Sequence, residues 1–204
     1  MKNAPTAILL TCAAIGVAGG ILLVPANWMS TVLFASVPFA AVAVAGLWLL
    51  PAVVALRLLQ RPLVGLLVGV ISGLVIVPFS GYGFGSVATN VWWAFFAELP
   101  FLIVLYRFWA TWQHYAGAIV VAAVYPVLAW VSFDLGSMPL GLQIAFVALT
   151  AASTVGATAL GILIADRLRD AGVARTARRR PKPAASVPSP ASPASPPPAR
   201  TTTD

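Results

Sequence analysis

Long apolar runs separated by short polar or charged breaks are the main pattern of this chain. No charged residue lies between Asn3 and Leu56, and none lies between Pro62 and Ala97. A helix needs ~20 mostly apolar residues to cross the hydrocarbon core of a bilayer. We expect six membrane-spanning helices, which cover approximately residues 6–25, 36–56, 62–79, 88–106, 115–133 and 143–164.

The composition agrees with this interpretation. The 204 residues include 12 Lys and Arg and 5 Asp and Glu, so 8% are charged and 60% are hydrophobic. A soluble domain has about 25% charged residues, because its surface must be largely polar. A soluble enzyme and a nucleic-acid-binding protein are therefore poor fits, and the single Cys12 excludes an internal disulfide framework. The pattern predicts an all-α integral membrane bundle.

The basic residues predict the orientation of the bundle. Eight of the 12 Lys and Arg residues follow Ile164, and the others are Lys2, Arg57, Arg61 and Arg107. With six spans, all of them fall on one side, which the positive-inside rule identifies as the cytoplasm. We therefore expect both termini to be cytoplasmic in a bacterial plasma membrane. The first run is long for a signal peptide, so we expect it to be retained.

The C-terminal segment has a different composition. Eight prolines lie between Pro181 and Asp204, mixed with Ala and Ser, and the segment carries no apolar periodicity. We expect a six-helix domain over residues 1–173 and a disordered, basic cytoplasmic tail over residues 174–204. For the basic run at 178–182, contact with anionic lipid is the simplest role, and a specific partner site is the alternative.

Glu98 is the main candidate for function within the spans. An ionisable side chain at membrane depth is costly unless it is paired, and is therefore a functional candidate. Glu98 lies about ten residues into the fourth predicted span, which would place it near the middle of the membrane. Pro100 follows it and removes a backbone donor. A structural carboxyl that bonds to a neighbouring helix is the alternative interpretation of Glu98.

Aromatic and amide side chains accompany this carboxylate. Rings provide stacking and cation–π contacts, and a carboxylate provides a countercharge, so together they suit a flat cationic heteroaromatic ligand. An interfacial belt is the alternative role for the tryptophans. The predicted substrate-binding residues are Glu98, Asn90, Trp92, Trp93, Phe95, Tyr82 and Trp130, and Tyr125 and Asn27 are further candidates on the external half.

The sequence gives little support for catalysis or metal binding. It has no His/Cys/Asp cluster with metal-ligand spacing, no nucleophile with a nearby base, and no G-x-x-x-x-G-K-[ST] phosphate loop. We therefore expect no enzyme activity, no metal, no cofactor and no nucleic-acid partner. Any ATP hydrolysis must come from another chain.

Small residues recur at four-residue intervals in the first span. Such spacing lets two helices approach closely. Internal packing is one explanation, and a docking face for another membrane subunit, formed by Ala14, Gly16 and Ala18, is the other.

Several short motifs resemble a known family. They are Gly46-Leu47-Trp48, Gln60-Arg61-Pro62, Ala97-Glu98-Leu99-Pro100-Phe101, Tyr106-Arg107-Phe108-Trp109, and the ending Ala165-Asp166-Arg167-Leu168 with Asp170-Ala171-Gly172-Val173. This pattern, which covers residues 46–173, is similar to the YkoE-type substrate-binding (S) components of energy-coupling factor (ECF) vitamin transporters.

The resemblance implies a six-helix protein that captures thiamine or its hydroxymethylpyrimidine precursor from the external side. Its partners would be a transmembrane coupling subunit and two cytoplasmic ATPases, with Ala14, Gly16 and Ala18 on the docking face. The chain departs from the family where Trp93 and Ala94 replace an expected Gln-Gly pair, which bears on the substrate. The alternatives are an S component for another vitamin, a non-transporting assembly subunit in which Glu98 is structural, and a membrane-embedded enzyme.

Overall fold

The computed structural model describes residues 6–36, 38–132 and 134–173, and every regular element in these ranges is a helix. The α-helices are α1 (Thr6–Ser36), α2 (Pro38–Val44), α3 (Leu50–Leu59), α4 (Val64–Ile76), α5 (Gly85–Ile103), α6 (Thr111–Ala129) and α7 (Leu140–Asp170). Short 3₁₀ turns lie at η1 (Ala45–Leu49), η2 (Val77–Phe79) and η3 (Leu135–Ser137). The tail predicted at residues 174–204 lies outside the described ranges.

Five helical segments are long and apolar enough to cross a membrane. They are Thr6–Leu33, Phe39–Leu59, Gly85–Ile103, Thr111–Ala129 and Leu140–Asp170. The prediction of an all-helical membrane bundle is therefore confirmed. The third predicted span is shorter than expected, because Val64–Phe79 falls below that length and α4 has only 13 residues.

The first helix is longer than predicted. We expected it to end near Pro25, but α1 continues to Ser36 with Pro25 inside it. A proline removes only its own backbone donor, and the apolar residues that follow allow the helix to continue. As a result α1 crosses the whole molecule and brings Asn27 toward its far end.

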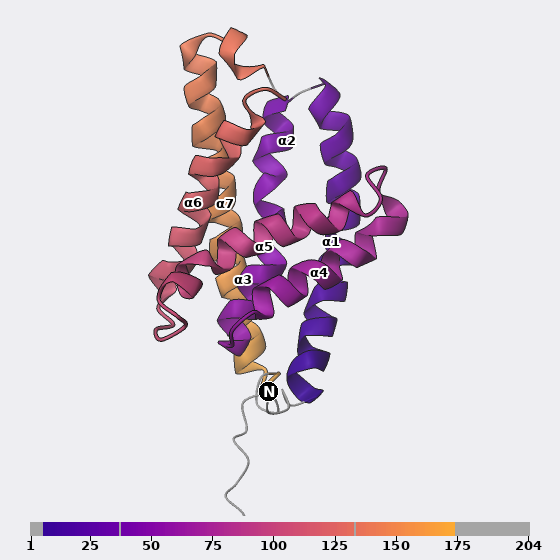
Figure 1. Ribbon diagram of the computed structural model, residues 1–204, viewed down its shortest axis with the longest axis vertical. Helices are drawn as coiled ribbons and strands as arrows, with labels where there is room; N and C mark the ends of the chain where they lie inside the picture. The colour runs from indigo at the N-terminus through magenta and orange to yellow at the C-terminus, as the bar shows by residue number, and fades with distance from the viewer. Residues whose placement is uncertain (1–5, 37, 133, 174–204) are drawn as a thin grey trace, which may run out of the picture.

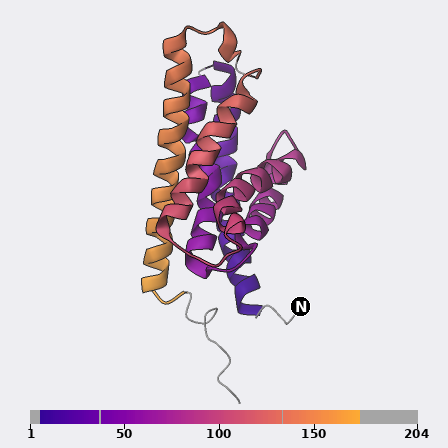
Figure 2. The same cartoon turned by 60° about the vertical axis from the view of Figure 1, so that its left-hand side comes forward.

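The helices form two sets with different directions. α1, the α2–α3 segment, α6 and α7 run along the long axis of the molecule, whereas α4 and α5 lie across it as a hairpin (Figures 1 and 2). The start of α1 and the end of α7 lie at the same end, which we call the terminal end (Figure 1). The turns at residues 60–63 and 104–110 join the hairpin to the other helices.

A row of glycines lets the two helices of the hairpin pack closely. Gly65, Gly69 and Gly73 recur every four residues on α4. A Cβ atom on Gly69 would lie 2.6 Å from the Cβ of Ala94, and one on Gly73 would lie 2.7 Å from the Cα of Val87. Any side chain at these two positions would push α4 away from α5.

The helical segment made of α2 and α3 is interrupted by η1 where it meets α7. The backbone N–H of Gly46 donates to Ser153 Oγ at 2.9 Å, and that hydroxyl donates to the carbonyl oxygen of Ala43 at 2.7 Å. A Cβ atom on Gly46 would lie 2.1 Å from the carbonyl oxygen of Ser153, so only glycine fits. This contact coincides with the 3₁₀ turn η1, which carries Trp48.

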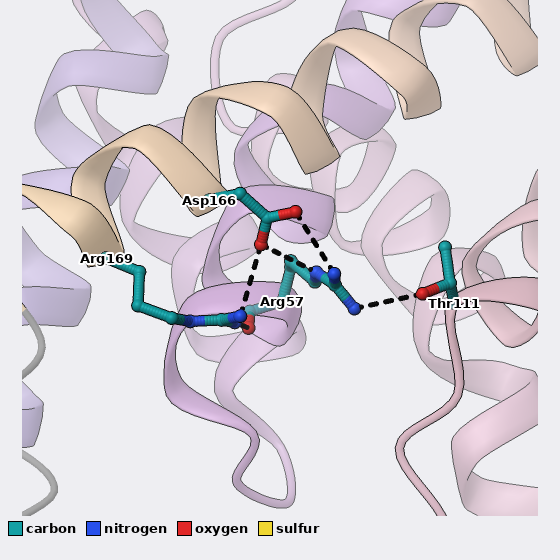
Figure 3. Close-up of polar contacts among 4 residues, drawn as sticks. All are labelled: Arg57, Thr111, Asp166 and Arg169. Carbon is teal, nitrogen blue, oxygen red and sulfur yellow. Dashed lines mark hydrogen bonds and ion pairs between the residues drawn. The ribbon is translucent and has the colours of Figure 1, made fainter.

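An ionic network joins three helices at the terminal end (Figure 3). Arg57 of α3 donates to both carboxylate oxygens of Asp166 on α7, at 3.0 and 3.1 Å, and to Thr111 Oγ1 of α6 at 3.1 Å. Arg169 pairs with the same carboxylate at 3.2 Å and donates to the carbonyl oxygen of Arg57. The network fixes the ends of α3, α6 and α7 relative to one another.

Candidate functional site

A cavity of about 210 Å³ lies between the hairpin and the upright helices. Its walls come from the second half of α1, from α2 and η1, from the first half of α5, and from α6. The lining residues are Asn27, Ser30, Thr31, Ala41, Ala45, Trp48, Tyr82, Ser86, Thr89, Asn90, Trp93 and Tyr125. Since α1 and α6 both start at the terminal end and contribute their later residues, the cavity lies toward the opposite end.

Aromatic rings form one wall of this cavity. Trp93 is buried, and its ring centroid lies 5.2 Å from that of Tyr125 and 6.5 Å from that of Trp48. Trp92 packs edge-on against Trp93 at 5.2 Å from the outer side. These contacts fix the orientation of Trp93 where it lines the cavity.

Polar groups on α5 form a second wall. Ser86, Asn90 and Trp93 are spaced by four and three residues, so they share one face of the helix. The side-chain Nδ2 of Asn90 donates to the carbonyl oxygen of Ser86 at 2.8 Å, and Ser72 Oγ lies 3.5 Å from Asn90 Oδ1. These contacts hold the amide of Asn90 in one orientation. The residue is buried, with 3% of its surface exposed.

The described residues around the cavity carry no charge. Their polar groups are amides and hydroxyls, from Asn27, Asn90 and the serine, threonine and tyrosine side chains. Such groups bind a ligand by hydrogen bonds and provide no countercharge for a cation. The described part of the chain also contains no group of three or more His, Cys, Asp or Glu residues that could hold a metal ion.

A shallower groove of about 450 Å³ adjoins the cavity between α5 and α6. It shares Thr89, Trp93 and Tyr125 with the cavity and adds Trp92, Leu128 and three smaller residues, Ala88, Ala129 and Ser132. The Trp93–Tyr125 pair therefore stands between two spaces, of which the cavity is the more polar.

The structure brings together only some of the predicted substrate-binding residues. Asn90, Trp93 and Tyr82 line the cavity, and Trp92 lines the adjoining groove. Phe95 and Trp130 line neither space, and both are exposed, at 37% and 44%.

Glu98 lies apart from both spaces. Its Oε1 accepts from the backbone N–H of Leu63 at 2.6 Å and from the Tyr106 hydroxyl at 3.0 Å, and its Oε2 accepts from the N–H of Leu66 at 2.9 Å. The side chain is 2% exposed. Its partners are the first turn of α4 and the turn after α5. These hydrogen bonds are those of a structural carboxyl bonded to a neighbouring helix, the alternative interpretation of Glu98.

The predicted position of Glu98 near the middle of the membrane depends on the direction of α5. Counting ten residues into a span gives a mid-membrane position only if the helix runs along the membrane normal. Because α5 lies obliquely across the other long helices, a count of residues along it does not measure depth (Figures 1 and 2). Glu98 instead lies beside the turn that contains Arg61 and Leu63, at the base of the hairpin.

The predicted docking residues separate onto two faces of α1. Gly16 is buried, and a Cβ atom there would lie 2.7 Å from the Cβ of Ile71 on α4, so Gly16 serves packing within the chain. Ala14 and Ala18 are exposed and share a face with Leu10 and Ile21, which are 65% and 62% exposed.

Most cavity residues outside the predicted set are small and polar. Ser86 lies four residues before Asn90, a spacing that places both residues on one face of a helix and that is visible in the sequence. Trp48, Ser30 and Thr31 carried no such signal, because only the packing of distant helices brings them into the cavity.

Comparisons with known proteins agree with this architecture. Residues 8–125 match the family described as "ABC-type cobalt transport system, permease component". The fold is similar to that of a protein solved as "Crystal structure of an S-component of ECF transporter", with a TM-score of 0.73 and 16% sequence identity over 82% of this chain and 87% of that one. No curated protein matches the chain.

Proposed function

Since the chain belongs to the family of permease components of ABC-type cobalt transport systems, we propose that it is the substrate-capturing S component of an ECF importer. Membership of a transport family confirms the expectation that the chain is not an enzyme. The observation that carries the proposal is the aromatic- and amide-lined cavity in the half of the bundle away from the terminal end. The similarity of fold to an ECF S component supports it.

We propose a flat heteroaromatic compound as the substrate. Trp93, Tyr125 and Trp48 offer ring faces, and Asn90 and Asn27 offer amide groups that can pair with the edge of a ring. Sites for drug-sized ligands usually measure about 300–1,000 Å³. A cavity of about 210 Å³ therefore suits a ligand with a single ring.

Between the two substrates expected from the sequence, the cavity favours hydroxymethylpyrimidine over thiamine. Thiamine carries a permanent positive charge on its second ring, and an unpaired charge in a buried site costs several kcal/mol. Glu98 was the expected countercharge, but its carboxylate is bonded to Leu63, Leu66 and Tyr106. A neutral pyrimidine requires no such partner.

The family description also names cobalt, but the geometry supports an organic substrate. Metal sites in proteins need several His, Cys or carboxylate ligands at short range. The residues that line the cavity offer amides, hydroxyls and rings instead. We therefore base the proposed substrate on the shape and chemistry of the cavity.

We propose that the terminal end faces the cytoplasm. Each arginine in the described ranges lies in or beside the turns and helix ends at that end: Arg57, Arg61, Arg107, Arg167 and Arg169. This distribution follows the positive-inside rule. It leaves the cavity on the external half, where a captured compound would enter.

Transport would require partner subunits. The chain has no phosphate-binding loop, so we propose that a transmembrane coupling subunit and two cytoplasmic ATPases drive uptake. The exposed face of α1 that carries Ala14 and Ala18 is the proposed docking surface for the coupling subunit, since small side chains allow a close helix contact. Gly16 does not belong to that surface.

Ligand binding to the detergent-purified protein tests the proposal. Hydroxymethylpyrimidine should quench tryptophan fluorescence, and thiamine should bind more weakly. Trp93→Leu should weaken binding ~10-fold, because stacking on an aromatic ring contributes ~1–3 kcal/mol. Trp130→Leu is the matched control, since Trp130 lies outside the cavity and should leave affinity unchanged. Absence of binding by the wild type would refute the proposed substrate.

A further inference from the structure

The hydroxyl of Ser86 differs from the other hydroxyls nearby. Its side chain is 5% exposed, its Oγ has no hydrogen-bond partner in the described part of the chain, and it lines the cavity. By contrast, Thr31 and Thr89 line the same cavity but donate to the carbonyl oxygens of Asn27 and Gly85, four residues earlier. Ser86 is therefore a residue that lines the cavity and carries a buried, unpaired hydroxyl.

The neighbours of Ser86 do not satisfy it. The closest amide, from Asn90, donates to the carbonyl oxygen of Ser86 and not to its hydroxyl. The carbonyl oxygen of Tyr82, four residues before Ser86, accepts from the backbone N–H of Gly85 at 3.0 Å. A buried hydroxyl without a partner costs free energy. A ligand group that pairs with it therefore forms a hydrogen bond that the ligand-free protein does not make.

We propose that Ser86 is the specificity-determining residue of the cavity, and that it selects an uncharged ring with a hydrogen-bonding group on its edge. This inference rests on the proposed function. Ser86 and Asn90 contact the edge of the ring, while Trp93, on the same face of α5, contacts its plane. A hydroxyl can both donate and accept, so a ring nitrogen or an amino group satisfies it equally well.

The proposal predicts two effects of Ser86→Ala, one on the unfolding temperature and one on ligand affinity. The substitution removes an unpaired buried group, so the empty protein should unfold at the same temperature as the wild type or higher. It also leaves the edge group of a bound ligand without a partner, so affinity should fall about tenfold. A merely structural serine would lose stability and leave the relative affinities of ligands unchanged.

Thr150→Val is the matched control. Thr150 is buried on α7 and lines neither the cavity nor the adjoining groove, and its hydroxyl is bonded to the carbonyl oxygen of Phe146 at 2.8 Å. Its substitution should change the affinity for hydroxymethylpyrimidine by less than about twofold and should lower the unfolding temperature slightly.

The test measures thermal unfolding without ligand and binding of two probes to the full chain in detergent. The probes are hydroxymethylpyrimidine and a benzene analogue that keeps the hydroxymethyl group but lacks the ring nitrogens and the amino group. Wild type should prefer the pyrimidine by about tenfold, and Ser86→Ala should remove most of that preference without loss of stability.

Three results would overturn the inference. If the wild type prefers the pyrimidine and Ser86→Ala keeps that preference, Ser86 does not determine specificity, although the proposed function stands. If Ser86→Ala lowers the unfolding temperature, its role is structural. If the wild type binds neither probe, the proposed substrate class fails together with the inference.

Discussion

The carboxylate of Glu98 accepts a hydrogen bond from the backbone N–H of Leu63 at 2.6 Å. A second bond from Leu66 at 2.9 Å places the acid at the start of α4, where helical N–H groups lack partners within the helix. An acidic group at this position is stabilised further by the helix dipole. A third bond, from the Tyr106 hydroxyl at 3.0 Å, extends the contact to the turn after α5.

The two turns held by Glu98 have strained backbones. Gln60 and Leu63 have φ angles of 49° and 63°, and Leu105 and Tyr106 have φ angles of 52° and 57°. Left-handed conformations cost a non-glycine residue roughly 1–2 kcal/mol. The hydrogen bonds of Glu98 offset part of this strain, which explains why a carboxylate is kept in an apolar region.

Replacement of Glu98 by Gln should lower stability and leave ligand affinity nearly unchanged. The amide keeps one acceptor oxygen but places an NH₂ group against a backbone or phenolic donor, so we expect a loss of about 2–3 kcal/mol. Thermal unfolding in detergent and a binding titration measure the two effects. Normal stability together with lost binding would instead support Glu98 as a countercharge for the ligand.

Tyr106→Phe should destabilise the protein by about 1–2 kcal/mol, since it removes one hydrogen bond to a charged acceptor and keeps the ring. Burial and the nearby Glu98 carboxylate raise the pKa of Tyr106 to about 12. A phenol in an unfolded chain titrates near 10, so the folded state holds this proton more tightly. The stability that the protonated Tyr106 hydroxyl contributes is therefore fully present below pH ~10, and it is lost as the pH rises through about 12.

The difference in unfolding free energy between Tyr106→Phe and wild type should accordingly stay constant from pH ~6 to ~9. Urea or thermal unfolding at several pH values checks it. A difference that changes across this range would mean that the Tyr106 proton is lost at lower pH than the structure indicates.

Gly46→Ala should be strongly destabilising. A methyl group there would lie 2.1 Å from the carbonyl oxygen of Ser153, so α7 must move away and the hydroxyl bridge to Ala43 is strained. Overpacking of this kind costs about 1–3 kcal/mol. Gly156→Ala on α7 is the control, because nothing lies within 4 Å of its Cβ position.

Gly156→Ala should raise stability by about 0.5–1 kcal/mol through helix propensity alone. Unfolding temperatures of the two variants therefore should move in opposite directions. Equal effects would show that α7 does not approach η1 as closely as described.

Arg57 and Asp166 should show a measurable coupling in a double-mutant cycle. We expect about 1 kcal/mol for Arg57→Met combined with Asp166→Asn, since the pair is bidentate but partly exposed. High salt should reduce the coupling. Additive effects of the two substitutions would indicate that the network shown in Figure 3 contributes no net stability.

The sequence was sufficient for the class of fold and insufficient for the directions of its helices. Apolar runs and charged breaks located the helical segments, because both depend on local composition. They did not show that α4 and α5 lie crosswise, which depends on contacts between distant helices, such as Gly16 of α1 with Ile71 of α4. Counting residues along α5 therefore gives no depth for Glu98, whereas three of the predicted substrate-binding residues, Asn90, Trp93 and Tyr82, line the cavity.

The crosswise hairpin has a mechanical consequence. Both of its tethers lie at the Glu98 end, while Gly81 and Gly83 in its opposite loop have nothing within 4 Å of their Cβ positions. Ser86 is twelve residues from Glu98 along α5, a lever of ~18 Å at ~1.5 Å per residue. A tilt of ~10° about the base would shift Ser86 by ~3 Å, a full hydrogen-bond length, while the bonds of Glu98 would hardly change. The loop end of α4 is also packed on α1, where a Cβ atom on Gly20 would lie 2.6 Å from the Cβ of Val75, so such a tilt would have to carry α1 with it.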